Sequence, residues 1–210
     1  NFVLMLCLLT LLFPAIFATL MGSLPLVALV PRLNVWLDFS SHECLLALRR
    51  DSLEGVQAVP IDVNHPYEIS TLFDGAIVYA KGARLLRMLQ HYIGHDAFQV
   101  GLKNYFVKHA YGNTEADDLW SELTATSGKD IAQFMTTWIS QSGYPVLHVT
   151  QHDTVVSLSQ EQFFVGPHKP SQNICPIPLV SPAPPMPQLL DPKQYNGARA
   201  PTTQLRSNHA

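Results

Sequence analysis

The sequence predicts a mainly α-helical protein that continues into a β-hairpin and ends in a proline-rich tail. Apolar residues recur at three- and four-residue spacing from Asp38 to about Gly143, and they alternate at every second position over 145–160. Ten of the sixteen prolines lie in 166–210. We therefore expect a helical domain over 32–143, the start of a β-domain over 144–180, and a tail over 181–210 without stable structure.

The composition is that of a globular protein and makes some partners improbable. The chain has 47% hydrophobic and 14% charged residues and a net charge of −3. No basic stripe is present that could neutralise phosphates, so we expect no nucleic-acid partner. The three cysteines are far apart and form no CxxC pair, which favours a reducing compartment.

Residues 1–31 carry no charged side chain and raise the question of a membrane segment. By hydropathy alone the stretch is long enough to span a bilayer. It is interrupted by Pro14 and Pro25, however, and Arg32 is its only charged flank. It also lacks the basic start and the small-residue cleavage site of a signal peptide. Composition alone leaves a membrane or export role open.

The helical region begins with a short element and then contains one long one. Residues 41–50 predict a short helix with basic residues in its last turn, whereas the prolines in 54–66 predict irregular backbone. Residues 74–93 predict the longest helix, and Gly94 is placed to end it. Its apolar stripe consists of Ala76, Tyr79, Ala83, Leu86, Leu89 and Ile93.

Three more helices are predicted by capping signals followed by apolar periodicity. The helices are expected to begin near 96, at 115 and at 131, and to end near Gly112, at 126 and at 141. The pairs expected to form their N-terminal capping boxes are Asp96 with Gln99, Thr114 with Asp117, and Asp130 with Gln133.

The pattern changes after Gly143. Residues 145–150 and 154–160 alternate at period two around a short turn at His152 and Asp153, which predicts a β-hairpin. A domain boundary near Gly143 follows from this change of period.

Two pairs among the nine histidines have the four-residue spacing of metal ligands on a helix. His91 and His95 are four residues apart, but Gly94 is expected to separate them into two helices, and no Glu follows the first histidine. His148 and His152 share the spacing on the expected hairpin, where surface polar residues are the favoured interpretation. No GxSxG motif and no glycine-rich phosphate loop is present.

Residues 73–82 (FDGAIVYAKG) are the one constellation that suggests chemistry. Taken alone, Tyr79 is an aromatic side chain on the inner face of a helix, and a core tyrosine is the default interpretation. The small residues around it permit close approach of a neighbouring element or a substrate; they are Gly75, Ala76, Ala80, Gly82 and Ala83.

This string resembles the tyrosine motif of the M1-family zinc aminopeptidases, in which a YxKG stretch begins a long helix beside the zinc site. Further blocks resemble the same family in the same order, together covering roughly residues 34–165, and the cytoplasmic aminopeptidase N-type enzymes of lactic-acid bacteria are the most similar. The matching blocks are LALRRDSLEGVQ (46–57), HPYEISTLFDGAIVYAKGARLLRMLQHYIG (65–94), YFVKHAYGNTEADDLW (105–120), MTTWISQSGYPVLHV (135–149) and NICPIPL (173–179).

The resemblance implies a fold and a catalytic role. The fold would be the helical C-terminal part of a thermolysin-like catalytic domain, followed by the start of a β-sandwich domain. Tyr79 would donate its phenolic proton to the oxyanion that forms when zinc-activated water attacks the N-terminal peptide bond. Peptides would be the substrates, zinc the cofactor of the complete enzyme, and the cytoplasm its location.

The sequence also departs from the family. It contains no HExxH motif and no GxMEN segment, and Ala15, in PAIFAT, stands where the family has a glutamate zinc ligand. Residues 1–31 are then a degenerate form of the zinc-domain helices, which makes a membrane role improbable. We expect this chain by itself to bind no zinc and to be inactive. The alternatives are a non-catalytic helical module that self-associates through exposed apolar faces, or a protein anchored through 1–31.

Overall fold

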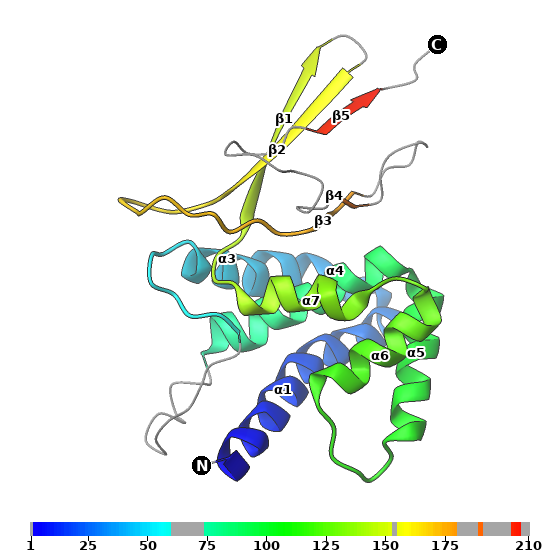
Figure 1. Ribbon diagram of the computed structural model, residues 1–210. Helices are drawn as coiled ribbons and strands as arrows, with labels where there is room; N and C mark the ends of the chain where they lie inside the picture. The colour runs from blue at the N-terminus through cyan, green and yellow to red at the C-terminus, as the bar shows by residue number, and fades with distance from the viewer. Residues whose placement is uncertain (1, 60–73, 153–154, 180–188, 191–202, 207–210) are drawn as a thin grey trace. The chain divides into compact units, whose positions relative to one another are not determined.

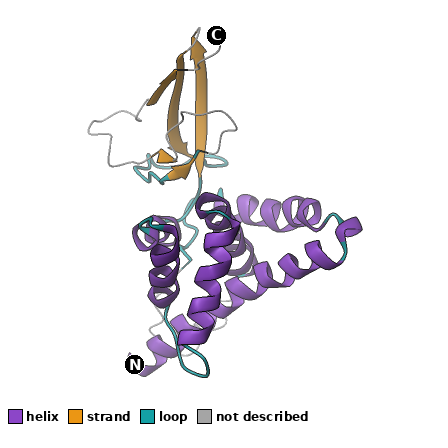
Figure 2. Cartoon of the chain, turned by 90° about the vertical axis from the view of Figure 1, so that its right-hand side faces the viewer, coloured by secondary structure: helices purple, strands orange, loops and turns teal. Residues whose placement is uncertain are grey.

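The computed structural model describes residues 2–59, 74–152, 155–179, 189–190 and 203–206, and for 2–15, 151–152, 155–156, 190 and 203–206 the backbone alone. Helices make up 61% of the described residues, which confirms the predicted mainly α class. The chain forms two compact units, one of 1–51 and 56–142, and one of 52–55 and 143–210. Helices belong to the first unit and strands to the second (Figure 2).

The first unit begins with one long helix. Helix α1 (Phe2–Leu29) continues through Pro14 and Pro25, although sequence alone suggested interruptions there. Among the residues described, no single helix is both long and apolar enough to cross a bilayer; only the pair Ile16–Leu29 and Pro31–Asp51, bent by 118°, satisfies the criteria of length and composition together. Of α1, Ile16 and Leu20 belong to the buried core.

A helical stretch follows that is longer than the predicted 41–50. A short 3₁₀ turn, η1 (Pro31–Leu33), leads into α2 (Val35–Phe39), a π-helical turn η2 (Ser40–Cys44) and α3 (Leu45–Asp51). The helical stretch begins before residue 41 because of contacts with a distant part of the chain. The guanidinium of Arg87 lies 3.2 Å from the centre of the Trp36 ring, and that of Arg84 lies 5.4 Å from the Phe39 ring, so two cation–π contacts hold α2 against the next long helix.

The predicted helix 74–93 is present and has two parts. Residues Gly75–Lys81 form a π-helix, η4, which continues without a break as α4 (Gly82–Ile93). Gly94 ends it with a φ of 91°, a left-handed conformation that glycine adopts without strain. The predicted apolar stripe is buried apart from Tyr79 and Ile93, which are partly exposed.

The remaining helices are α5 (His95–Lys108), α6 (Ala116–Ser127) and α7 (Ile131–Ser140). Figure 1 shows α5 and α6 lying side by side, and the ion pair between Lys108 and Glu122, 2.7 Å apart, joins them. The core of this part of the unit consists of Phe98, Leu119, Trp120, Leu123, Ile131, Phe134, Met135 and Trp138.

Two of the three predicted capping boxes are wrong. Helix α5 begins at His95 directly after Gly94, so Asp96 lies inside the helix and caps nothing. In α6 the capping box is formed by Glu115 and Asp118, because the Thr114 hydroxyl is engaged by the Tyr105 hydroxyl at 2.7 Å. The third prediction places its cap correctly, since the Asp130 carboxylate accepts a hydrogen bond from the Gln133 backbone N–H.

The second unit contains the predicted hairpin. Strands β1 (Pro145–His152) and β2 (Val155–Gln162) pair antiparallel, and β5 (Thr203–Arg206) pairs with the other edge of β2. The short strands β3 (Ile177–Pro178) and β4 (Leu189–Leu190) form a second sheet. Most of the predicted tail, 181–210, lies outside the described residues, and so does Asp153 of the expected turn.

Candidate functional site

Tyr79 lies in the π-helix η4, within a stretch whose other side chains are mostly buried. Val78 and Ala80, its neighbours on either side, are fully buried, whereas Tyr79 is partly exposed. A π-helix has i→i+5 hydrogen bonds and is a rare backbone form that occurs frequently at functional sites. The structure thus leaves part of Tyr79 accessible, beside buried residues of the same π-helix.

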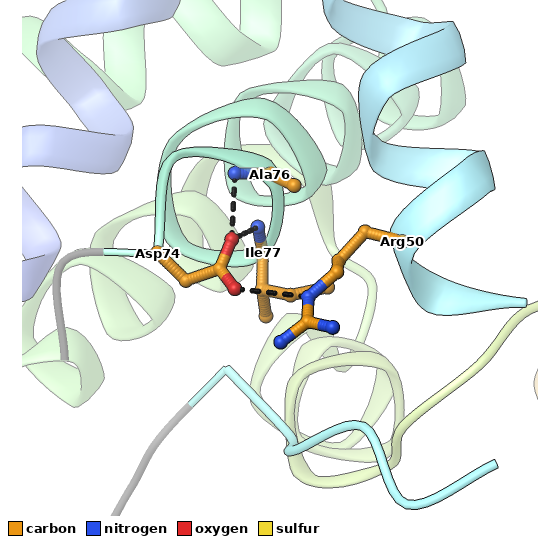
Figure 3. Close-up of polar contacts among 4 residues, drawn as sticks. All are labelled: Arg50, Asp74, Ala76 and Ile77. Carbon is orange, nitrogen blue, oxygen red and sulfur yellow. Dashed lines mark hydrogen bonds and ion pairs between the residues drawn. The ribbon is translucent and has the colours of Figure 1, made fainter. Parts of the chain in front are cut away.

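The N-terminal end of η4 is fixed by Asp74 (Figure 3). One carboxylate oxygen accepts hydrogen bonds from the backbone N–H groups of Ala76 (2.8 Å) and Ile77 (3.1 Å), and the other accepts one from Nε of Arg50 in α3 (3.2 Å). Burial raises the pKa of Asp74, but the two backbone hydrogen bonds and Arg50 together outweigh it, so the net pKa is lowered. The carboxylate is therefore charged at neutral pH and forms a strong helix cap.

The C-terminal end of η4 is fixed by a buried ion pair. Nζ of Lys81 lies 2.8 Å from a carboxylate oxygen of Asp51, and the two side chains are only 7% and 3% exposed. The same ammonium donates a hydrogen bond to the backbone carbonyl of Gln141 at 3.0 Å, at the end of α7. The lysine of the YxKG motif therefore connects η4 to two other helices inside the unit.

The glycine of the motif allows α1 to approach. A Cβ atom added at Gly82 would lie 2.6 Å from Cγ1 of Ile16, which is closer than any ordinary carbon contact. The predicted close approach of a neighbouring element is thus found at Gly82. At Gly75, by contrast, nothing lies within 4 Å of the position of an added Cβ.

The structure places the histidines of the first spaced pair on two different helices. Gly94 separates His91, in the last turn of α4, from His95, the first residue of α5, as the sequence indicated. His148 instead contacts Glu161 across the hairpin at 2.8 Å, and the His152 side chain lies outside the described residues. Within the described ranges, no group of three or more His, Cys, Asp or Glu side chains could hold a metal ion.

Ala15 lies in helix α1, but its side chain is outside the described residues. The residue is an alanine in the sequence, and its methyl group cannot coordinate a metal. Ala15 thus supplies no zinc ligand, and the part of the chain that the structure describes holds no group of side chains that fits a zinc ion.

Sequence reasoning missed the charged partners of the motif. Arg50 and Asp51 are adjacent in α3 and contact Asp74 and Lys81 respectively. Their separation along the chain exceeds 20 residues and has no periodicity, so no local pattern could reveal the pairing. A signal was nevertheless available: Lys81 interrupts an otherwise small and apolar helical stretch, and a lysine at such a position needs a buried partner.

Comparison with known proteins places these features in a family. The profile of the Peptidase family M1 domain matches residues 10–138. The chain is 48% identical over 163 residues to "Aminopeptidase N" of Lactococcus lactis subsp. lactis (strain IL1403), and 44% identical over 163 residues to "Aminopeptidase N" of Lactobacillus delbrueckii subsp. lactis. It is also 40% identical over 163 residues to "Tricorn protease-interacting factor F2" of Thermoplasma acidophilum.

Each of these alignments covers 78% of this chain but a much smaller part of the relative. The chain spans 19% of the length of the two aminopeptidases and 21% of the length of the archaeal protein. The aligned 163 residues and the profile match both include the stretch that carries Tyr79, Lys81 and Gly82. Because the family profile matches more than half of the chain and the YxKG helix lies within that match, the chain belongs to peptidase family M1.

Proposed function

We propose that this chain forms the tyrosine-bearing helical part of a metallo-aminopeptidase that removes N-terminal amino acids from peptides, and that Tyr79 stabilises the oxyanion of the reaction. The observation that carries the proposal is the partly exposed Tyr79 on the π-helix of a chain that belongs to the M1 family. The name aminopeptidase N, which relatives 40–48% identical carry, supports the peptide substrate class.

The proposed role of Tyr79 is to donate a hydrogen bond. When water adds to the first peptide carbonyl, the carbonyl oxygen gains negative charge, and the C–N bond breaks as the intermediate collapses. A phenol keeps its proton at neutral pH and can donate it in a hydrogen bond to that oxygen. Losing one such donor typically lowers the rate by about 10²–10³.

Zinc supplies activation of water and of the carbonyl in complete metallo-aminopeptidases of this type. Because no group of side chains among the described residues fits a zinc ion, we assign this chain the role of Tyr79 and no zinc-dependent step. We infer that the 210-residue chain by itself does not hydrolyse peptides. Its zinc content after mild dialysis should be near background in plasma mass spectrometry, and near-stoichiometric zinc would contradict the inference.

A graft tests the role of Tyr79 in a complete enzyme. The segment of Lactococcus lactis aminopeptidase N that aligns with residues 34–165 is replaced by those residues, once unchanged and once with Tyr79→Phe. The Tyr79→Phe graft should have a kcat about 10²–10³ lower towards an aminoacyl anilide than the unchanged graft. Tyr111→Phe, at a fully exposed tyrosine, is the matched control and should retain kcat.

Exposed apolar side chains favour a second candidate function, self-association as an interaction module. They recur along the end of α1, in α2 and at the start of α3, and exposed apolar surface of this kind marks protein contacts where it is contiguous. We define this apolar patch as Leu26, Leu29, Val30, Leu33, Leu37, Leu45 and Leu46, with exposures between 40% and 78%.

The patch is tested by the size of the particle in solution. Light scattering after size exclusion should show a dimer or larger particle for the natural chain, and a monomer for the Leu29→Lys/Leu37→Lys variant. A natural chain that is monomeric would refute self-association.

A separate experiment tests the location of the chain. Flotation with phosphatidylcholine vesicles would indicate a membrane role, whereas recovery in the soluble cell fraction would support the cytoplasmic location that we propose from the family resemblance.

A further inference from the structure

Two adjacent residues of α3 carry opposite charges and contact opposite charges on either side of Tyr79. Arg50 pairs with Asp74, five residues before the tyrosine, at 3.2 Å. Asp51 pairs with Lys81, two residues after it, at 2.8 Å. The end of a single helix therefore contacts both ends of the π-helix η4.

The two ion pairs differ in their exposure to solvent. Lys81 and Asp51 are 7% and 3% exposed, so their charges lie in a poorly screened interior. Arg50 and Asp74 are 49% and 20% exposed, and their pair is correspondingly weaker. We call Lys81–Asp51 the inner pair and Arg50–Asp74 the outer pair. The inner pair thus contributes most to holding η4 against α3, and the outer pair orients the Asp74 carboxylate that caps η4.

Each pair also controls a specific piece of backbone. Asp74 accepts hydrogen bonds from the first N–H groups of η4, at Ala76 and Ile77, and so determines where the helix begins (Figure 3). Lys81 donates to the Gln141 carbonyl and so determines how the end of η4 lies against α7. The hydrogen-bond register between these two points decides in which direction the Tyr79 side chain leaves the helix.

We propose that Arg50, Asp51, Asp74 and Lys81 are positioning residues that hold η4 in its π-helical register and thereby direct the phenol of Tyr79. In an α-helix a shift of one residue rotates a side chain by about 100° around the axis, since 3.6 residues make one turn, and a shift in a π-helix likewise turns it to another face. Such a rotation would move the phenol out of reach of a bound substrate. The proposal rests on the proposed catalytic role of Tyr79.

The first test uses the whole 210-residue chain and needs no activity. The chain is produced with ¹³C-labelled tyrosine rings, and the Tyr79 signal is assigned by its loss in Tyr79→Phe. Arg50→Gln and Asp51→Asn should each shift or broaden the Tyr79 ring signal, and Asp51→Asn should do so more strongly. Lys108→Met is the matched control, because it removes an ion pair of similar length between α5 and α6, and it should leave the signal unchanged.

The second test uses the same variants in the grafted complete enzyme. A misplacement of about 1 Å can cost about 10²-fold in rate. Asp51→Asn should therefore lower kcat by about 10- to 10²-fold and change KM by less than about twofold, because the donor acts on the transition state rather than on substrate binding. Arg50→Gln should lower kcat less, and Lys108→Met should not lower it.

The outcomes separate this proposal from the one on which it rests. If Tyr79→Phe retains full kcat in the graft, the catalytic role of Tyr79 is wrong. If Tyr79→Phe loses activity while Arg50→Gln and Asp51→Asn retain both kcat and the natural Tyr79 signal, Tyr79 keeps its role and the positioning proposal is overturned. If Asp51→Asn fails to fold, Arg50→Gln decides alone, since it removes only the half-exposed outer pair.

Discussion

Replacing Lys81 by methionine should destabilise the helical unit more than any exposed charge substitution. Lys81→Met keeps most of the side chain's length, one atom short of lysine, but leaves the Asp51 carboxylate, 3% exposed, without its cation. Removing one partner of a buried ion pair typically costs about 3–5 kcal/mol in the free energy of unfolding. That is a large share of the about 5–15 kcal/mol that stabilises an ordinary domain.

The size of the expected effect makes it easy to measure. With a urea slope of about 2 kcal/mol per M, a loss of about 4 kcal/mol lowers the unfolding midpoint by about 2 M. Circular dichroism at 222 nm follows the helical unit directly, since the strands belong to the other unit. Lys108→Met breaks the pair with Glu122, whose lysine is 61% exposed, and should lower the midpoint far less than Lys81→Met does.

A double replacement separates the lost attraction from the cost of an unpaired buried charge. Asp51→Leu/Lys81→Met removes both charges and fills the space with apolar atoms, so it should recover most of the stability lost by Lys81→Met. The reasoning is refuted if Lys81→Met unfolds at the same urea concentration as Lys108→Met. It is also refuted if the double variant is no more stable than Lys81→Met alone.

Three further predictions concern the same helices. Gly82→Ala should lower the free energy of unfolding by about 1–3 kcal/mol, measured by urea titration, because the added methyl group clashes with Ile16. Adding Ile16→Ala should relieve that clash. Gly75→Ala is the control, since its methyl group meets nothing within 4 Å, and it should be neutral or stabilising in the same titration. Asp74→Ala should cost about 1 kcal/mol at neutral pH. The pKa of Asp74 is lower in the folded protein than in the unfolded chain, where it is about 4. Asp74 therefore stabilises the fold at pH above the unfolded pKa and loses this effect as pH falls through the folded pKa. Asp74→Asn should accordingly flatten the acid side of a plot of stability against pH. His91 should titrate below its ordinary value of 6.5 in a proton NMR titration, because burial and then a neighbouring guanidinium disfavour its charged form; a normal titration would contradict the described packing.

Local sequence signals predicted those elements whose causes are local. The helix over 74–93 was predicted because its stripe of Ala76, Leu86 and Leu89 repeats at helical spacing, and its end was predicted because Gly94 follows. The hairpin followed from period-two alternation. The cap at Asp130 was placed correctly because an N-cap acts on a backbone N–H three residues away.

The errors arose where a distant contact overrides the local signal. The hydroxyl of Thr114 is a good N-cap by composition, but Tyr105 engages it and the cap moves to Glu115. Residues 35–40 contain no strong helix signal, yet they are helical because Trp36 and Phe39 lie under the guanidinium groups of α4. Neither contact can be inferred from nearby residues.

The sequence by itself determined the family, the helical class and the position of Tyr79 in a YxKG stretch, because the order of motifs and the spacing of apolar residues can be read directly along the chain. Only the tertiary structure decided that this stretch is π-helical, that Gly82 admits Ile16, and that the charges of α3 contact both ends of η4. The physical reason is that ion pairs and close packing depend on distances in space between residues far apart in the chain. Periodicity carries no information about those distances.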